Sequence, residues 1–170
     1  DLFELIELGK KHSLAPDSHL NITLGPLIQT WRIGFADAKV PSPEEIKQAL
    51  SLTDPECIEL DAIASSVFLT MEGMKIDLGA LAKGYIADKI AAFLRGQGVT
   101  SALINLGGNI LTIGLNEKNN RYWRIGIQNP SLPRGNNLAL LSVQNQSVVT
   151  SGIYERKLQV DGRVYHHIFD

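Results

Sequence analysis

The sequence predicts an α+β fold with a mostly antiparallel sheet and packed helices. An amphipathic helical pattern begins at Ala82 and is stopped by Gly96 and Gly98. Downstream of Gly114 the pattern becomes strand-like, with short apolar runs separated by polar or glycine-rich turns. Asp161-Gly162 separates two of these runs and is typical of a two-residue β-hairpin. Together these patterns indicate the α+β class.

The first residues predict short helical segments around one strand. Apolar residues at 2–8, followed by two lysines, predict a helix with a basic last turn. Residues 21–24 are a candidate strand, which Gly25-Pro26 would end. The apolar residues after Pro26 predict a further helical turn that reaches Trp31.

Ser42 marks the start of the next predicted helix, which runs to about Leu50. Ser42 suits the N-cap, Pro43 suits the first helical position, and Glu45 is placed to complete a capping box.

The middle of the chain predicts a hairpin followed by a buried helix. Between residues 60 and 76 the apolar residues are mostly β-branched, which predicts a hairpin leading into Asp77. The helix that begins at Ala82 is predicted to bury a stripe, made of Ala82, Tyr85, Ile86, Ile90, Phe93 and Leu94.

The remaining chain is predicted to be a series of strands. A buried strand at 102–106 is broken by Gly107-Gly108 before a second strand at 110–113. The further predicted strands and hairpin cover residues 122–127, 138–143, 147–150 and 154–169.

Composition limits the classes of partner. The 170 residues suffice for one domain with a core, and we expect a single domain over residues 1–170. With 16 basic and 18 acidic residues the net charge is −2, and no basic stripe follows the sequence, so we expect no nucleic-acid partner. Cys57 is the sole cysteine, which excludes an internal disulfide. No apolar run approaches the ~20 residues that cross a bilayer.

The block from Asp77 to Tyr85 is the strongest candidate site. It places a carboxylate and small residues before a helix, where backbone N–H groups can bind a phosphate. Asp77 suits a metal or a ligand hydroxyl, and it equally suits a helix N-cap. Lys83 opposes the helix dipole, which a bound anion would explain, although a solvated lysine is the alternative. Gly84 inside a helix suggests close packing against a backbone or a ligand.

Four other segments have both a functional and a structural interpretation. Trp31 and its neighbours could stack on a planar ligand, or Trp31 could be a core residue beside a turn. Asn105 with Gly107-Gly108-Asn109 suits a ligand site or an ordinary turn. Thr150 could contact a phosphate or simply end a strand. His166 and His167 face opposite ways on a strand, so at most one of them can serve a metal.

Five motifs occur in a fixed order across nearly the whole chain. They are Gly25-Pro26-Leu27 with Trp31, Asp77-Leu78-Gly79-Ala80-Leu81-Ala82-Lys83-Gly84-Tyr85 with Asp88, Asn105-Leu106-Gly107-Gly108-Asn109-Ile110, Thr150-Ser151-Gly152 with Tyr154, and His167-Ile168-Phe169-Asp170. In this order the motifs resemble the bacterial FAD:protein FMN transferases, the ApbE family of flavin transferases. The resemblance implies an ApbE-like architecture related to the T-fold.

The resemblance implies a magnesium-dependent enzyme that takes FAD as its substrate. Such an enzyme transfers FMN from FAD to a threonine or serine hydroxyl of an acceptor flavoprotein and releases AMP, while magnesium neutralises the pyrophosphate. Two alternatives are kept: an FAD pyrophosphatase that yields FMN and AMP, and a flavin-binding module without catalysis. The resemblance also implies a bacterial lipoprotein outside the cytoplasm, held at the cytoplasmic membrane through an anchor that this chain does not contain.

The same resemblance assigns roles to individual residues. His167 is implied to be catalytic, and the backbone oxygen of Ala80 is implied to bind Mg²⁺. The implied FAD contacts are Trp31, Ile33, Gly34, Asp77, Lys83 and Ile168, with Phe169 beside them. Ala80 stands where the family often has a second glycine, and alanine offers the same carbonyl.

We expect the chain to be a fragment of a longer protein. It begins without methionine inside a helical pattern and stops at Asp170 directly after an apolar strand. The resemblance implies that an N-terminal stretch covering FAD, and an aspartate and a threonine completing the magnesium site, lie outside it. We therefore expect this chain alone to bind magnesium poorly and to have reduced or no flavin transfer.

Overall fold

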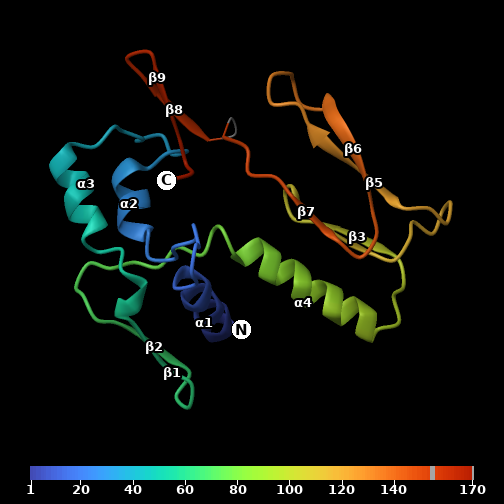
Figure 1. Ribbon diagram of the computed structural model, residues 1–170, viewed down its shortest axis with the longest axis horizontal. Coiled ribbons are helices and arrows are strands. Elements are labelled where there is room, and N and C mark those ends of the chain that lie inside the picture. The colour runs from blue at the N-terminus through green and yellow to red at the C-terminus, as the bar shows by residue number, and fades with distance from the viewer. Residues whose placement is uncertain (154–155, 170) are drawn as a thin grey trace. The chain divides into compact units, whose positions relative to one another are not determined.

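The computed structural model describes residues 1–153 and 156–169 and divides into two compact units (Figure 1). Unit 1 consists of Asp1–Leu81 with Ile153–Asp170, and unit 2 consists of Ala82–Gly152. The single domain expected over residues 1–170 stays a prediction.

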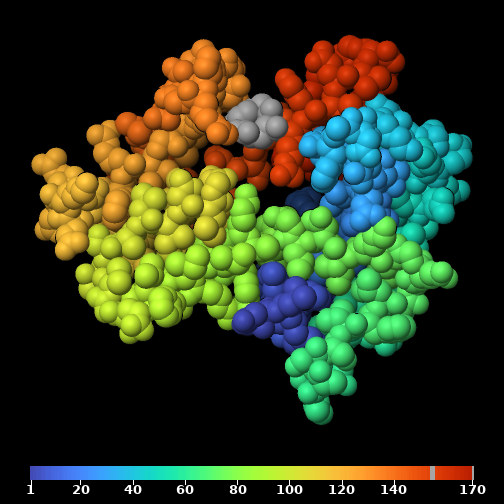
Figure 2. All heavy atoms as spheres, turned by 180° about the vertical axis from the view of Figure 1, so that it is seen from behind, coloured from blue at the N-terminus to red at the C-terminus, as the bar shows by residue number. Residues whose placement is uncertain are grey.

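Unit 1 combines helices with two separate β-hairpins. Its elements are α1 (Leu2–Ser13), α2 (Gly25–Trp31), α3 (Pro43–Leu50), a 3-10 helix (Pro55–Cys57), the hairpin of β1 (Ile58–Asp61) and β2 (Ser66–Leu69), and the hairpin of β8 (Lys157–Val160) and β9 (Arg163–His166). Both hairpins are antiparallel. The tip of the β1–β2 hairpin stands out from this unit in Figure 2, and Ile63 at the tip is fully exposed.

Unit 2 packs one helix on a small sheet and adds a two-stranded ribbon. Its elements are α4 (Ala82–Gly96), β3 (Ala102–Asn105), β4 (Asn109–Ile113), β5 (Trp123–Gln128), β6 (Asn137–Val143) and β7 (Ser147–Val149). The three-stranded sheet has the order β3-β4-β7, and β5 pairs with β6. Every strand pairing of the described residues is antiparallel, which confirms the predicted fold class.

The strand predicted at residues 21–24 is wrong, because these residues form a turn. The Oδ1 atom of Asn21 accepts hydrogen bonds from the backbone N–H of Thr23 at 2.8 Å and from its hydroxyl at 2.6 Å. This local side-chain bonding competes with a strand. Ile22 is nevertheless buried, and with Ile6 and Ile58 it forms the core of unit 1.

The predicted buried face of α4 is wrong in part. The fully buried residues are Ala87 and Ala91, each 1% exposed, whereas Ile86 is 46% and Phe93 is 66% exposed. Two alanines four residues apart let the helix approach the sheet closely, and Leu111 of β4 belongs to the same cluster. Ile90 and Leu94 from the predicted stripe do pack against this core.

The hairpin predicted between residues 60 and 76 is confirmed, although it ends earlier than expected. Its strands pair from Ile58 with Leu69 to Asp61 with Ser66. Residues 70–81 then form turns and extended segments rather than a strand that reaches Asp77.

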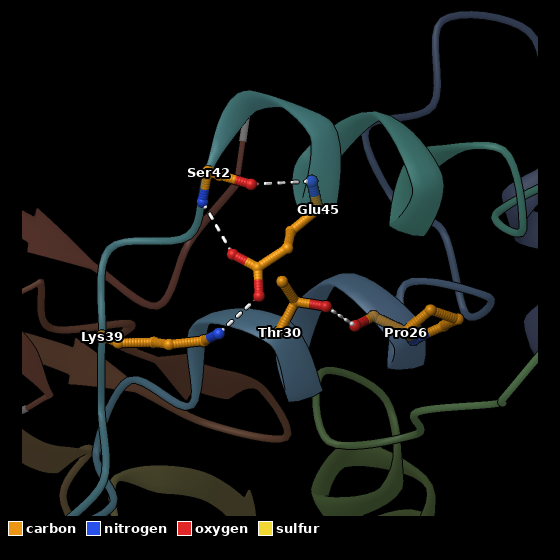
Figure 3. A network of polar contacts seen from close by, with 5 residues as sticks. All are labelled: Pro26, Thr30, Lys39, Ser42 and Glu45. Carbon is orange, nitrogen blue, oxygen red and sulfur yellow. Dashed lines mark hydrogen bonds and ion pairs between the residues drawn. The ribbon is translucent and has the colours of Figure 1, made fainter.

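The capping box predicted for α3 is present (Figure 3). The hydroxyl of Ser42 accepts from the backbone N–H of Glu45 at 3.2 Å, and the backbone N–H of Ser42 donates to Oε2 of Glu45 at 2.8 Å. The second carboxylate oxygen of Glu45 pairs with Nζ of Lys39 at 2.5 Å.

No helix in the described part of the chain is long and apolar enough to span a membrane.

Candidate functional site

The loop at residues 31–39, which begins at the last residue of α2, carries three of the predicted flavin contacts. Backbone hydrogen bonds hold both of its ends. Arg32 ends α2 in the left-handed conformation, with φ of 52°, and its N–H donates to the carbonyl of Ile28 at 2.8 Å. Further along, the N–H of Lys39 donates to the carbonyl of Trp31 at 3.1 Å. These bonds fix both ends of the loop at residues 31–39.

An ion pair braces this loop from within. Nε of Arg32 lies 2.6 Å from Oδ2 of Asp37, and the guanidinium of Arg32 stands 5.0 Å from the ring centroid of Phe35. The hydrogen bond from Arg32 lowers the pKa of the Asp37 carboxyl below its usual range. Asp37 is therefore ionised at neutral pH, and the loop has its own electrostatic support.

Trp31 meets an aromatic ring from the other end of the chain. The ring of Tyr165, on β9, lies with its centroid 5.1 Å from that of Trp31 and with the two planes tilted by 45°. Aromatic pairs favour such tilted arrangements at 4.5–7 Å. Trp31 is half-buried in this contact, and its role as a platform for a planar ligand stays a prediction.

Gly34 lies against the segment that precedes β8. Its φ is +95°, and a Cβ added there would lie 3.0 Å from Cδ of Arg156. The backbone conformation and the close neighbour both favour glycine at this position. The preceding residue, Ile33, is buried.

The predicted catalytic His167 is tied to the same segment. Its Nδ1 lies 3.4 Å from the carbonyl oxygen of Arg156. A carbonyl oxygen only accepts, so a hydrogen bond between these two atoms requires the proton on Nδ1. The next residue, Ile168, is 39% exposed and offers an apolar surface beside it.

Asp77 caps a local turn and does not act as the N-cap of α4. Its Oδ1 accepts from the N–H of Gly79 at 2.8 Å, and its own N–H donates to the carbonyl of Ile22 at 2.8 Å. The helix begins later, at Ala82. The carboxylate is half-buried and held in one place, while Ala80 is exposed in the turn that follows.

Lys83 belongs to unit 2, where further motif residues come together at the start of α4. Lys83 is exposed in the first helical turn. A Cβ on Gly84 would lie 3.7 Å from Nδ2 of Asn109, an ordinary contact, so the close approach expected at Gly84 is absent from the described residues. Asn109 is a buried polar residue, and Oδ1 of Asn105 accepts from the N–H of Gly108 at 3.0 Å.

The structure thus groups the predicted residues in two sets. In unit 1, Trp31 packs on Tyr165 of β9, and both Gly34 and His167 lie near Arg156. Ile33, Ile168, Asp77 and Ala80 belong to the same unit, whereas Lys83 lies in unit 2.

Sequence reasoning missed Tyr165 and Arg156, because their contacts join segments far apart in the chain and leave no local pattern. The motif residues Tyr154 and Asp170 lie outside the described residues.

The described residues do not provide a complete magnesium site. Within residues 1–153 and 156–169, no group of three or more His, Cys, Asp or Glu side chains could hold a metal ion. Mg²⁺ requires near-octahedral oxygen coordination. The single Ala80 carbonyl falls short of that requirement, and one of the two carboxylate oxygens of Asp77 is already bonded to Gly79.

Known proteins are similar to this chain in sequence. The sequence model of the ApbE family matches residues 1–170. An FAD:protein FMN transferase of Klebsiella pneumoniae (strain 342) is 46% identical over 169 residues, which cover 99% of this chain and 51% of that protein. One of Treponema pallidum (strain Nichols) is 39% identical over 181 residues, which cover 99% of this chain and 50% of that protein.

A solved structure supports the same assignment. The ApbE protein of Thermotoga maritima is similar with a TM-score of 0.86 and 32% identity, over 99% of this chain and 54% of that one, which confirms the predicted ApbE-like fold. The chain spans about half the length of the relatives it matches. With its whole length matched by the family model and by these relatives, the chain belongs to the ApbE family.

Proposed function

We propose that the protein containing this chain transfers FMN from FAD to a threonine or serine hydroxyl of an acceptor flavoprotein and releases AMP. The observation that carries the proposal is the meeting of Trp31, Gly34 and His167 around one C-terminal segment, in a chain whose relatives are named FAD:protein FMN transferase.

The flavin half of FAD is proposed to lie against the loop at residues 31–39. Trp31 is proposed to offer an aromatic face to the flavin, and its ring packs on Tyr165. Gly34 adds no side chain of its own beside the proposed ring position, and the Arg156 side chain lies next to it. Ile168, which is 39% exposed, is proposed to add an apolar contact to the dimethylbenzene part of the flavin, and the buried Ile33 lies beside Gly34 in the chain.

His167 is proposed to accept the proton of the attacking hydroxyl. In the proposed reaction the hydroxyl oxygen forms a bond to the phosphorus of the FMN half, and the bond from that phosphorus to the bridging oxygen breaks. AMP leaves with the electron pair, while the proton passes to Nε2 of His167. The contact between Nδ1 and the carbonyl of Arg156 orients the ring for this transfer.

The remaining predicted contacts complete the proposal. Asp77, fixed by Gly79 and Ile22, is proposed to accept a hydrogen bond from FAD. Lys83 is proposed to lie against the cofactor. The Ala80 carbonyl is proposed as one magnesium ligand, and the described residues do not complete a magnesium site. The extracytoplasmic, membrane-anchored location rests on the family resemblance alone.

One assay separates the proposal from its alternatives. The protein is incubated with FAD, Mg²⁺ and a candidate acceptor, and the products are resolved by chromatography and mass spectrometry. Covalent FMN on the acceptor together with AMP supports the transferase. AMP with free FMN indicates an FAD pyrophosphatase, and bound FAD without turnover indicates a flavin-binding module.

A further inference from the structure

The β5–β6 ribbon of unit 2 carries a cavity that the proposed flavin chemistry does not use. The cavity has a volume of about 380 Å³. Its polar lining comes mainly from Arg121, Tyr122, Arg124, Ser142 and Gln144. None of these residues belongs to the motifs that carry the family resemblance.

Strand geometry explains why these side chains share one face. Arg124 pairs with Ser142 across the ribbon. Tyr122 lies two residues before Arg124, and Gln144 lies two residues after Ser142, so the two-residue period of a strand puts all four on the same side. The opposite side contains Ile125, which is buried.

Arg121 is held at the end of this face by a turn. Its carbonyl accepts from the N–H of Asn116 at 2.8 Å, and its N–H donates to Oδ1 of Asn119 at 3.0 Å. Asn120 adopts a φ of 52°, which suits the turn. The backbone from which the first guanidinium extends is therefore fixed before any ligand binds.

The charge of the cavity has one sign. Its lining contains two arginines and no carboxylate. Among residues 1–153 and 156–169, neither guanidinium has a hydrogen-bond or ion-pair partner. The N–H donors of both guanidinium groups are therefore available to a ligand.

A second cavity, in unit 1, shows the opposite situation. It measures about 420 Å³, and its lining includes Lys39, Glu45 and Lys75. Lys39 pairs with Glu45 (Figure 3), and Lys75 donates to the side-chain oxygen of Gln29. Each of these charged side chains already has a partner within the protein. The cavity therefore has fewer charged groups available to a ligand than the ribbon cavity has.

We propose that the ribbon cavity binds a phosphate group carried by a small molecule. Arg121 and Arg124 can each donate two parallel hydrogen bonds to oxygen atoms of one anion. The hydroxyls of Tyr122 and Ser142 and the amide of Gln144 add further donors. This number of donors exceeds what the two oxygens of a carboxylate accept and suits the three terminal oxygens of a phosphate monoester. The rest of the ligand would lie against Leu115 and the ring of Tyr122.

The test uses inorganic phosphate as the probe and backbone amide chemical shifts as the readout. Phosphate is titrated into the isotope-labelled protein at constant ionic strength, and sodium acetate is titrated in parallel. We expect phosphate to shift amides at residues 115–124 and 142–144 saturably, with acetate producing weaker binding. We expect the double variant R121Q/R124Q to bind phosphate about tenfold or more weakly, since it loses the charge-assisted hydrogen bonds of both guanidinium groups.

A charge-matched control separates the site from general attraction. The variant R95Q/R163Q removes two charges of the same sign at exposed positions that do not line the cavity, and it is expected to bind phosphate as the parent does. Dispersion of the amide spectrum shows that each variant is folded. Equal weakening in both double variants, acetate binding as tightly as phosphate, or no saturable shifts at these residues would overturn the proposal.

Discussion

The indole of Trp31 and the phenol ring of Tyr165 pack with their centroids 5.1 Å apart, although Trp31 is the last residue of α2 and Tyr165 lies on β9. The contact joins the loop at residues 31–39 to the segment that carries His167. The proposed flavin platform and the proposed base therefore depend on the same long-range packing.

Replacing Trp31 tests the flavin platform. We expect Trp31→Ala to weaken FAD binding strongly and Trp31→Phe to weaken it much less, because the second variant keeps an aromatic face against Tyr165. FAD affinity is measured from the quenching of flavin fluorescence on titration with protein. Trp123→Ala is the control for tryptophan loss in general and should leave FAD affinity unchanged, since Trp123, on β5, is not among the proposed FAD contacts. Similar affinities for Trp31→Ala and the parent would contradict the platform.

Gly34 and Gly135 form a matched pair for a second prediction. Both have a positive φ, +95° and +100°, but a Cβ at Gly34 meets Arg156 whereas a Cβ at Gly135 meets nothing within 4 Å. We expect both alanine variants to lose about 1–3 kcal/mol of unfolding free energy from backbone strain. The Gly34→Ala variant alone should also bind FAD more weakly. Chemical denaturation and FAD titration give the two quantities, and equal FAD affinities in the two variants would count against the proposed place of Gly34 in the site.

His167 is expected to affect turnover and not binding. His167→Asn removes the free Nε2, and we expect the transfer rate to fall by about 10²–10⁴ while the Kd for FAD stays near that of the parent. The transfer rate is followed by AMP release under saturating FAD.

The neighbouring histidine is the control for this substitution. His166→Asn changes the same residue type one position earlier, on β9, and should lower the rate far less. Comparable losses in both variants would show that His167 has no special role as the base.

The ion pair at the start of α3 predicts a dependence of stability on pH. The side-chain bond from Lys39, followed by the backbone N–H of Ser42, lowers the pKa of Glu45 below its ordinary value of 4.5. A lowered pKa in the folded state means that the stabilisation is present above pH 4.5 and is lost as pH falls through the folded-state pKa. We therefore expect Glu45→Gln to flatten the fall in unfolding free energy between pH 7 and about pH 3.

Urea unfolding at several pH values measures this effect. Because the pair is at the surface, raising the salt concentration should reduce it. Glu44→Gln, one residue earlier in α3, controls for the loss of a nearby carboxylate. A parent and a Glu45→Gln variant with the same pH profile would contradict the prediction.

Local chemistry made some elements predictable from the sequence. The capping box of Ser42 and Glu45 needs residues only three apart, and both of its hydrogen bonds are present. The turn at Asp161-Gly162 has positive φ at both residues, 49° and 75°, as a two-residue hairpin of this kind requires. These features are decided within one turn of the chain, so the sequence suffices to predict them.

Other features depend on contacts that the sequence does not reveal. At residues 21–24 the side chain of Asn21 captures the backbone and replaces the predicted strand with a turn. In α4 the apolar pattern fits more than one face, and close packing on the sheet selects Ala87 and Ala91. The pairing of Trp31 with Tyr165 likewise joins segments that only the fold brings together.

The most direct test of the account measures the mass of the acceptor protein. The protein containing this chain is incubated with FAD, Mg²⁺ and a flavoprotein acceptor, and the parallel reaction uses an acceptor whose target threonine is replaced by valine. We expect the first acceptor to gain the mass of one FMN less water, with one AMP released per acceptor, and the valine acceptor to remain unchanged. Release of AMP with free FMN, or no mass gain with FAD still bound, would contradict the transferase function.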